Sequence, residues 1–251
     1  MYSELIINIK NKTFKEENSK FSHIAIKDFY LKIPNGQFCC LIGPSGCGKT
    51  TILNIVAGLD LSKKSNVSFS DKSSYSQATI SYMFQTPRLL PWLNVINNVN
   101  IVLGKKNKDF KRTEKILEIM GLKKFLYSYP NKLSGGMQRR VALARSFITR
   151  PEILILDEPF VSLNEPIANM LREMLLKLWN EQPTTILFVT HDIREAIFLA
   201  DRIVFLPKAP AKVIKEEKIT ISRPRMFESN DIEKERKRIL FKNKNILDGI
   251  L

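Results

Sequence analysis

The apolar residues of this chain follow two patterns, which predict the strands and helices of a mixed α/β protein. Residues 37–42, 153–156 and 185–189 are continuous apolar runs, as expected for strands of a parallel sheet covered on both faces. Residues 167–178 instead repeat apolar side chains at helical spacing, which predicts a helix with that face on the sheet. The polar positions of this helix, among them Arg172, are expected to face away.

The same patterns give an order of elements along the 251 residues. Residues 5–42 are rich in strand patterns, whereas residues 90–147 are mostly helical in spacing. A further strand is predicted at residues 202–206 and a charged surface helix at residues 231–247. No apolar stretch approaches the roughly 20 residues that a membrane-spanning helix needs.

A glycine-rich segment lies between the first buried run and a helix predicted at residues 51–57. It fits the pattern G-x-x-x-x-G-K-[ST], in which backbone N–H groups and a helix N-terminus surround phosphate oxygens. Lys49 is then expected to reach the β- and γ-phosphates, and the Thr50 hydroxyl to bind Mg²⁺. The residues expected to contact the nucleotide phosphates here are Gly43, Pro44, Ser45, Gly46, Cys47, Gly48, Lys49, Thr50 and Thr51.

Two acidic residues, Asp157 and Glu158, follow the second buried run. Ligands of open α/β sheets bind outside the carboxyl ends of the strands, so Asp157 is expected near Mg²⁺. A strand period of two, if it persists to this point, turns Glu158 away from Asp157 and toward an attacking water. His191 follows the third buried run, so it is expected at the same edge of the sheet as Asp157.

A second glycine motif, Leu-Ser-Gly-Gly-Met-Gln, occupies residues 133–138 and leads into an arginine-rich helix predicted at residues 137–147. Ser134 is well placed to cap that helix, which leaves the N–H groups of Gly135 and Gly136 for an anion. The motif has no phosphate of its own to hold. It therefore indicates a half-site that a second subunit completes.

These motifs, in this order and with a glutamine between the two glycine motifs, resemble the ATPase subunits of ABC transporters over nearly the whole chain. The resemblance implies an α/β fold, a P-loop NTPase core of ABC ATPase type with an antiparallel β-subdomain and a helical signature subdomain. It implies a single domain at residues 1–251, whose core and β-subdomain are residues 1–89 and 148–207. Residues 90–147 are then the helical subdomain, and residues 208–251 a tail with a surface helix.

The resemblance also assigns contacts to the nucleotide. Phe14 corresponds to an aromatic that stacks on adenine, and Gln85 to a glutamine that senses the γ-phosphate and Mg²⁺ and faces the transmembrane partner. Ser134, Gly135 and Gly136 match the signature that contacts the γ-phosphate held by the opposite subunit. The implied cofactors are ATP and Mg²⁺.

For hydrolysis, the resemblance implies that Glu158 is the catalytic base and that His191 hydrogen-bonds the γ-phosphate and orients the water. Lys49 and Gln85 complete the expected catalytic set. The expected Mg²⁺ ligands are Thr50, Gln85 and Asp157. Because Glu158 and His191 are both present, active hydrolysis is expected.

Two segments depart from the family pattern. Residues 161–164 are Val-Ser-Leu-Asn, where the family usually has Ser-Ala-Leu-Asp. Asn164 keeps the hydrogen-bonding shape of aspartate but loses its charge, which puts the coupling between two ATP sites in question. Residues 60–100 contain no glycine, so the β-subdomain is expected to be shortened or irregular.

The net charge of +15 raises the question of nucleic-acid binding. The lysines are scattered among asparagines without aromatic interleaving, so no nucleic-acid partner is expected, although attraction to an anionic membrane surface is. The cysteines Cys39, Cys40 and Cys47 fit neither a disulfide framework nor a metal site, and the first residues do not resemble a signal peptide. The expected location is the cytoplasm, peripheral on the inner face of the cell membrane.

Segments 84–92, 129–134, 192–202 and 223–225 resemble the importer ATPases of the nitrate, sulfonate and taurine group. The expected function is therefore the ATP-hydrolysing subunit of an importer of small anionic or organic solutes. The expected partners are a second ATPase subunit in a homodimer, transmembrane permease subunits and, indirectly, a periplasmic substrate-binding protein.

Two alternatives stay open, a thiamine-pyrimidine precursor importer and a non-transport ABC ATPase that acts on nucleic acid. Within the second class, a DNA-repair ATPase needs a long coiled coil between the two glycine motifs, and a ribosome-acting factor needs two ATPase domains. Lys49 and Ser134 are 85 residues apart, too few for such a coiled coil, and the chain has the motifs of one ATPase domain.

Overall fold

The computed structural model describes residues 4–15, 22–60, 64–71, 75–104 and 109–243. By its internal contacts the chain divides into two compact units. Unit 1 comprises Met1–Ala78 and Thr185–Leu251, and unit 2 comprises Thr79–Thr184. The division of the chain into core, helical subdomain and tail that the sequence suggests stays a prediction.

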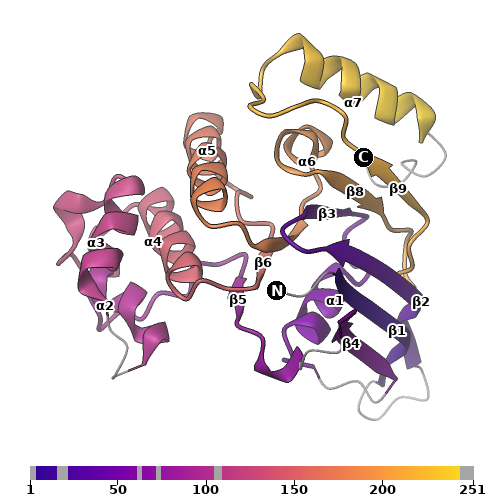
Figure 1. The fold of residues 1–251 in the computed structure, drawn as a ribbon, viewed down its shortest axis with the longest axis horizontal. Coiled ribbons are helices and arrows are strands. Elements are labelled where there is room, and N and C mark those ends of the chain that lie inside the picture. Colours follow the sequence, from indigo (N-terminus) through magenta and orange to yellow (C-terminus); the bar gives the residue numbers. More distant parts are fainter. Residues whose placement is uncertain (1–3, 16–21, 61–63, 72–74, 105–108, 244–251) are drawn as a thin grey trace. The chain divides into compact units, whose positions relative to one another are not determined.

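Unit 1 contains a three-stranded antiparallel sheet in the order β2-β1-β4 (Figure 1). Its strands are β1 (Glu4–Lys15), β2 (Ser22–Pro34) and β4 (Ser65–Phe69). Along β2 the buried side chains of Phe29, Leu31 and Ile33 alternate with exposed ones, because successive side chains of a strand point to opposite faces. The third strand, β4, comes from the glycine-free segment of residues 60–100. It is five residues long, whereas β1 has 12 residues.

The second set of strands in unit 1 is mostly parallel and carries the first glycine motif. The strand β3 (Phe38–Ile42) lies between β7 (Thr185–Val189) and β8 (Arg202–Phe205), parallel to both, and β9 (Lys215–Lys218) pairs antiparallel with β8. All five residues of β3 and of β7 are buried, as their continuous apolar runs predict.

Four helical segments complete the described part of unit 1. They are α1 (Lys49–Val56), the 3₁₀ turn η1 (Tyr75–Gln77), α6 (Ile193–Leu199) and α7 (Asn230–Lys242). The helix predicted at residues 231–247 corresponds to α7, and residues 244–247 of that prediction lie outside the described residues.

Two arginines of the tail close the C-terminal end of α6. Arg225, only 9% exposed, donates from Nη1 to the carbonyl oxygens of Ile197 (2.6 Å) and Ala200 (2.7 Å). Arg223 forms an ion pair with Asp201. Burial, with help from the nearby Arg223 charge, lowers the pKa of Arg225 to about 10. A cation at this end of a helix satisfies carbonyls without an intrahelical partner, and it interacts favourably with the helix dipole.

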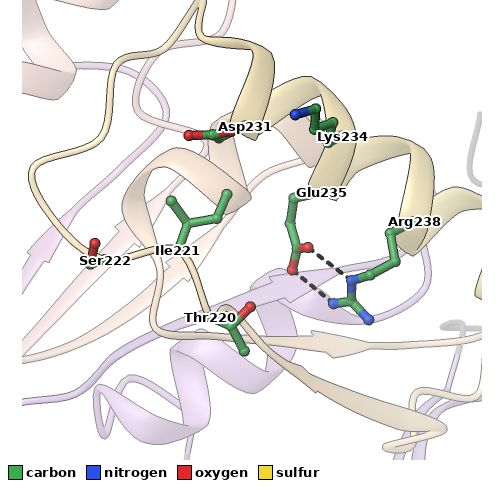
Figure 2. Close-up of a pocket in the computed structure, with 7 residues that line it drawn as sticks. All are labelled: Thr220, Ile221, Ser222, Asp231, Lys234, Glu235 and Arg238. Atoms are coloured by element: carbon green, nitrogen blue, oxygen red, sulfur yellow. Dashed lines mark hydrogen bonds and ion pairs between the residues drawn. The ribbon is translucent and has the colours of Figure 1, made fainter.

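A pocket of about 430 Å³ lies between α7 and the segment that follows β9 (Figure 2). Its lining includes Glu235 and Arg238, which are joined by two hydrogen bonds of 2.7 and 2.8 Å. Figure 2 labels its lining residues, which are Thr220, Ile221, Ser222, Asp231, Lys234, Glu235 and Arg238. None of them belongs to the motifs that carry the predicted chemistry.

Unit 2 combines two parallel strands with a helical segment. The strands are β5 (Ile80–Met83) and β6 (Ile153–Asp157). The helices are α2 (Val95–Asn100), α3 (Phe110–Ile119), α4 (Gly135–Ile148) and α5 (Glu165–Glu181), with the 3₁₀ turns η2 (Ile101–Leu103), η3 (Lys123–Phe125) and η4 (Pro130–Lys132). The prediction that residues 90–147 are mostly helical is confirmed.

The prediction for Arg172 is wrong. Arg172, on α5, is only 4% exposed, and its guanidinium donates to Glu165 at 2.7 Å and to Asn169 at 2.6 Å. It also lies 5.7 Å from the centre of the Phe160 ring. Partners on the same helix and an aromatic neighbour offset the cost of removing the charge from water, so a polar residue occupies the inner face. None of the helices in the described residues is both long and apolar enough to cross a membrane.

The loop that leads into α2 depends on one fully buried amide, that of Asn98. Its Oδ1 accepts from the N–H of Leu90 at 2.8 Å. Its Nδ2 donates to the carbonyls of Leu90, Leu93 and Asn94 at 3.1, 2.7 and 3.1 Å. These bonds fix the backbone of residues 90–94.

We expect Asn98→Ala to lower the free energy of unfolding by about 2–4 kcal/mol, because it removes partners from buried backbone groups. The measurement is urea unfolding of the full chain. The matched control is Asn97→Ala on the same helix, where the half-buried side chain makes the expected loss less than about 1 kcal/mol. Equal losses in the two variants would contradict the role assigned to Asn98.

Candidate functional site

The first glycine motif forms a tight turn between β3 and α1 in unit 1. Gly48 caps α1 with φ of 106°, and a Cβ there would lie 2.8 Å from the carbonyl oxygen of Ala25. Gly46 is also left-handed, with φ of 75°, but its Cβ would meet open space. Glycine is required at Gly48 for both backbone conformation and space. The predicted strand, turn and helix are all present.

The ammonium group of Lys49 contacts the backbone of this loop. Lys49 is 7% exposed, and its Nζ donates to the carbonyls of Gly43 at 2.6 Å and Pro44 at 2.9 Å. Ser45 and Thr50 are exposed at the same turn. A cation beside a helix N-terminus and a row of backbone N–H groups is a site for an anion such as phosphate.

Cys47 lies beneath the loop, 1% exposed. Burial raises the pKa of its thiol, so the side chain is neutral at pH 7 and acts as an apolar support. Cys39 and Cys40 in β3 are buried as well, and burial raises the pKa of Cys39 to about 12. All three thiols are free.

His191 leaves the sheet at the same edge as the glycine loop. In the parallel pair of β3 and β7, Leu41 lies opposite Val189, and the N–H of Thr190 donates to the Leu41 carbonyl at 3.5 Å. His191 follows directly and is exposed. Asp192 then caps α6 by accepting from the N–H of Arg194 at 2.8 Å. Unit 1 thus brings Lys49, Thr50 and His191 to one edge.

Phe14 lies on β1 with 45% of its surface exposed, so its ring is not part of the core. The ammonium of Lys12 lies 4.9 Å from the ring centre and is held by Asp60 at 2.7 Å. An exposed aromatic face is compatible with stacking on a base. The adenine contact itself stays a prediction.

In unit 2, Gln85 and Asp157 leave another pair of parallel strands at a common edge, because Met83 lies opposite Leu156. Asp157 is 9% exposed, and its Oδ2 accepts from the Tyr82 hydroxyl at 3.3 Å. Burial first, and then the Asp157 charge, raise the pKa of Tyr82 well above its usual value. Tyr82 stacks on Phe84 at 4.1 Å, and this stack precedes the exposed Gln85.

Glu158 does not continue the strand alternation that the sequence suggested. The strand β6 ends at Asp157, and Glu158 has φ of 44°. Such a left-handed conformation is uncommon for a residue with a side chain, and it is typical of functional positions. The direction of Glu158 is therefore set by this turn and not by the strand period.

The second glycine motif forms the N-terminus of α4. The helix begins at Gly135, two residues before the predicted start, and Ser134 caps it by accepting from the N–H of Met137 at 3.3 Å. A Cβ at Gly136 would lie 2.9 Å from Ile167, whereas one at Gly135 would meet nothing. The N–H groups of this first turn have no intrahelical partner, so the helix end can receive an anion.

Asn164, the position that departs from the family pattern, caps α5. Its Oδ1 accepts from the N–H of Ile167 at 3.3 Å, a role for which asparagine and aspartate are similarly favoured. This local role is compatible with the missing charge. Its effect on the coupling of two ATP sites stays a prediction.

Sequence reasoning missed three side chains that organise unit 2, Tyr82, Arg139 and Arg145. Arg145 donates to the carbonyls of Pro87 at 2.7 Å and Arg88 at 2.9 Å. The arginines are visible in the sequence as part of an arginine-rich helix, but their backbone partners are more than 50 residues away or lie in another loop. Only the folded chain identifies these contacts.

Comparisons with known proteins all identify similarity to ABC transporter proteins. The ABC transporter family model matches residues 26–161. The aliphatic sulfonates import ATP-binding protein SsuB of Bacillus subtilis is 38% identical over 93% of this chain and 92% of its own. The nitrate import ATP-binding protein NrtD of Synechococcus elongatus is 39% identical over 82% of this chain and 78% of its own.

Among solved structures, a dimeric post-hydrolysis state of the ATP-binding cassette MJ0796 bound to ADP and Pi is similar, with a TM-score of 0.73 and 30% identity. The match covers 87% of this chain and 100% of the other.

The glycine loop generates a testable difference between two glycines. Gly48→Ala should lower the free energy of unfolding by about 2–4 kcal/mol, because it adds a backbone clash to an unfavourable φ. Gly46→Ala, which meets no atom, should cost only about 1–2 kcal/mol. Denaturant unfolding of both variants provides the comparison. A Gly46→Ala loss as large as that of Gly48→Ala would contradict the close contact between Gly48 and the Ala25 carbonyl.

Proposed function

This chain belongs to the ABC transporter family and hydrolyses ATP, and we propose that it powers an importer of small anionic solutes of the sulfonate or nitrate type. The observation that carries the proposal is that both glycine motifs form helix N-termini, a geometry suited to anions, in a chain 38% identical to a sulfonate importer subunit over 93% of its length. The substrate class comes from the relatives.

In the proposed reaction, the P-loop of unit 1 binds the phosphates of ATP, and Lys49 and His191 stabilise charge at the γ-phosphate. Glu158 accepts a proton from a water whose oxygen forms a new bond to the γ-phosphorus. The bond from that phosphorus to the oxygen bridging the β- and γ-phosphates breaks, which gives ADP and inorganic phosphate. These proposed roles are supported by the charge of the side chains and by their position in the loops that follow the strands.

The donor atoms available also fit Mg²⁺, which prefers oxygen ligands. Thr50 offers an exposed hydroxyl, Asp157 a carboxylate oriented by Tyr82, and Gln85 an exposed amide oxygen. When bound, Mg²⁺ neutralises charge on the β- and γ-phosphate oxygens. These three residues are its proposed ligands.

A second copy of the chain completes each site in this proposal. Ser134, Gly135 and Gly136 contact the γ-phosphate held by the P-loop of the partner, so ATP stabilises the dimer and hydrolysis releases it. Exposed apolar side chains follow Gln85, with Trp92 at 69% exposure, and an exposed aromatic beside this loop suits a permease contact. In this proposal the chain works at the inner face of the cell membrane, and a periplasmic substrate-binding protein delivers the solute to the permease.

Removing the proposed base should separate ATP binding from hydrolysis. Glu158→Gln should lower ATP turnover at least 100-fold, because the amide is too weak a base to accept the proton from water. It should also convert the protein to a stable dimer in saturating ATP and Mg²⁺, as measured by light scattering after size exclusion. The matched control is Glu173→Gln at an exposed position on α5, which should keep normal turnover. A Glu158→Gln protein that stays monomeric under these conditions would refute the assigned roles.

The substrate class is tested in the assembled transporter. The chain is purified with its permease in lipid vesicles, and vanadate-sensitive ATP hydrolysis is measured with the binding protein and one solute at a time. An alkanesulfonate or nitrate should stimulate hydrolysis several-fold. Stimulation by a pyrimidine alone would reject the proposed class in favour of the thiamine-precursor alternative.

A further inference from the structure

Arg139, in the second turn of α4, connects two separate loops of unit 2 through three hydrogen bonds. Its Nη1 donates to the carbonyls of Gln85 at 3.0 Å and Pro159 at 2.6 Å, and its Nη2 donates to that of Val161 at 2.8 Å. Within the described part of the chain no carboxylate pairs with this guanidinium. All three of its hydrogen bonds therefore go to backbone carbonyls.

The loop that Arg139 holds is strained. Glu158 and Ser162 have φ of 44° and 61°, and the carbonyls of Pro159 and Val161 lie between them. The turn's own backbone bonds are long, 3.3 Å from Val161 to Glu158 and 3.4 Å from Leu163 to Phe160. Strained residues persist only when their surroundings fix them. Charge-assisted hydrogen bonds from a planar guanidinium are a strong means of doing so.

Arg145 shows which part of this arrangement is specific to Arg139. It lies on the same helix and contacts Pro87 and Arg88, in the loop that follows Gln85. Arg145 therefore fastens one loop to α4. Arg139 fastens two, the loop of Gln85 and the loop of Glu158, and both carry proposed catalytic residues.

We propose that Arg139 is a positioning residue, which fixes the loops of Gln85 and Glu158 to the signature helix α4. The helix and the two loops then move together when Ser134 contacts nucleotide. The inference rests on the proposed roles of Gln85 and Glu158. The signature helix begins one turn before Arg139, and a displacement of the helix end is carried to both loops through the guanidinium. Lysine, with a single ammonium, cannot reproduce a fork that serves three carbonyls.

The test compares Arg139→Gln and Arg139→Lys with Arg140→Gln in the full chain. Arg140 is the matched control because it is also half-buried on α4 but donates to the Met120 carbonyl at 3.0 Å, away from both loops. We expect Arg139→Gln to lower kcat for ATP at least tenfold, with KM and ADP affinity within twofold of wild type. Arg139→Lys should lower kcat at least threefold but less than Arg139→Gln does, and Arg140→Gln should stay within twofold of wild type.

Hydrogen exchange gives a second readout. Amides of residues 158–163 should exchange faster in Arg139→Gln than in Arg140→Gln. A kcat within twofold of wild type in Arg139→Gln, or a loss no larger than the loss of folded protein, would overturn the inference. If Arg139→Gln fails to fold, Arg139→Lys decides, because unchanged kcat in that variant also overturns it.

Glu158→Gln, assayed in parallel, separates this inference from the proposed function. Full hydrolysis by Glu158→Gln means that the proposed base is wrong. Loss of hydrolysis in Glu158→Gln together with normal hydrolysis in Arg139→Gln rejects only the positioning role.

Discussion

Parallel pairing of buried strands is the constraint that determines where most of the candidate site residues lie. In unit 1, β3 and β7 are in register, so the turn after Ile42 and the residue after Thr190 emerge at one edge. In unit 2, β5 and β6 do the same for Gln85 and Asp157. These strands are apolar because both faces are covered, and the polar candidate residues that they position therefore lie at or just past their ends. The apolar runs that bury these strands therefore also determine where the candidate site residues lie.

Backbone conformations that are unfavourable in isolation occur at several of these strand ends. In the P-loop, glycine provides them at little cost in the folded state, as at Gly48, where a side chain would contact the Ala25 carbonyl. After β6 there is no glycine, and Glu158 and Ser162 adopt positive φ with their side chains in place. The two loops thus solve the same geometric problem differently. One uses a residue without a side chain, and the backbone of the other accepts hydrogen bonds from Arg139 on a neighbouring helix.

The sequence predicted those parts of the structure that depend on local pattern. Continuous apolar runs identified β3, β6 and β7, and the glycine spacing identified the turn before α1, because both signals act over a few residues. The sequence did not predict the placement of side chains that depends on tertiary contacts. Arg172 looked like a surface residue on a polar stripe, yet Glu165, Asn169 and the Phe160 ring allow it to be buried. The carbonyl partners of Arg139 could not be inferred either, since backbone acceptors leave no mark on the identity of the residues that supply them.

The two helix ends that are proposed to bind phosphate differ in charge, and this difference suggests an order of binding. The P-loop joins a helix N-terminus to the ammonium of Lys49, whereas the end of α4 offers backbone N–H groups and the Ser134 cap without a cation in its first turn. A full charge attracts phosphate more strongly than the partial charge of a helix end. ATP should therefore bind first at the P-loop, and the signature of a second copy should add its weaker contacts only to nucleotide already held there. In the proposed function, closure of the dimer would then depend on ATP that is already bound at the P-loop.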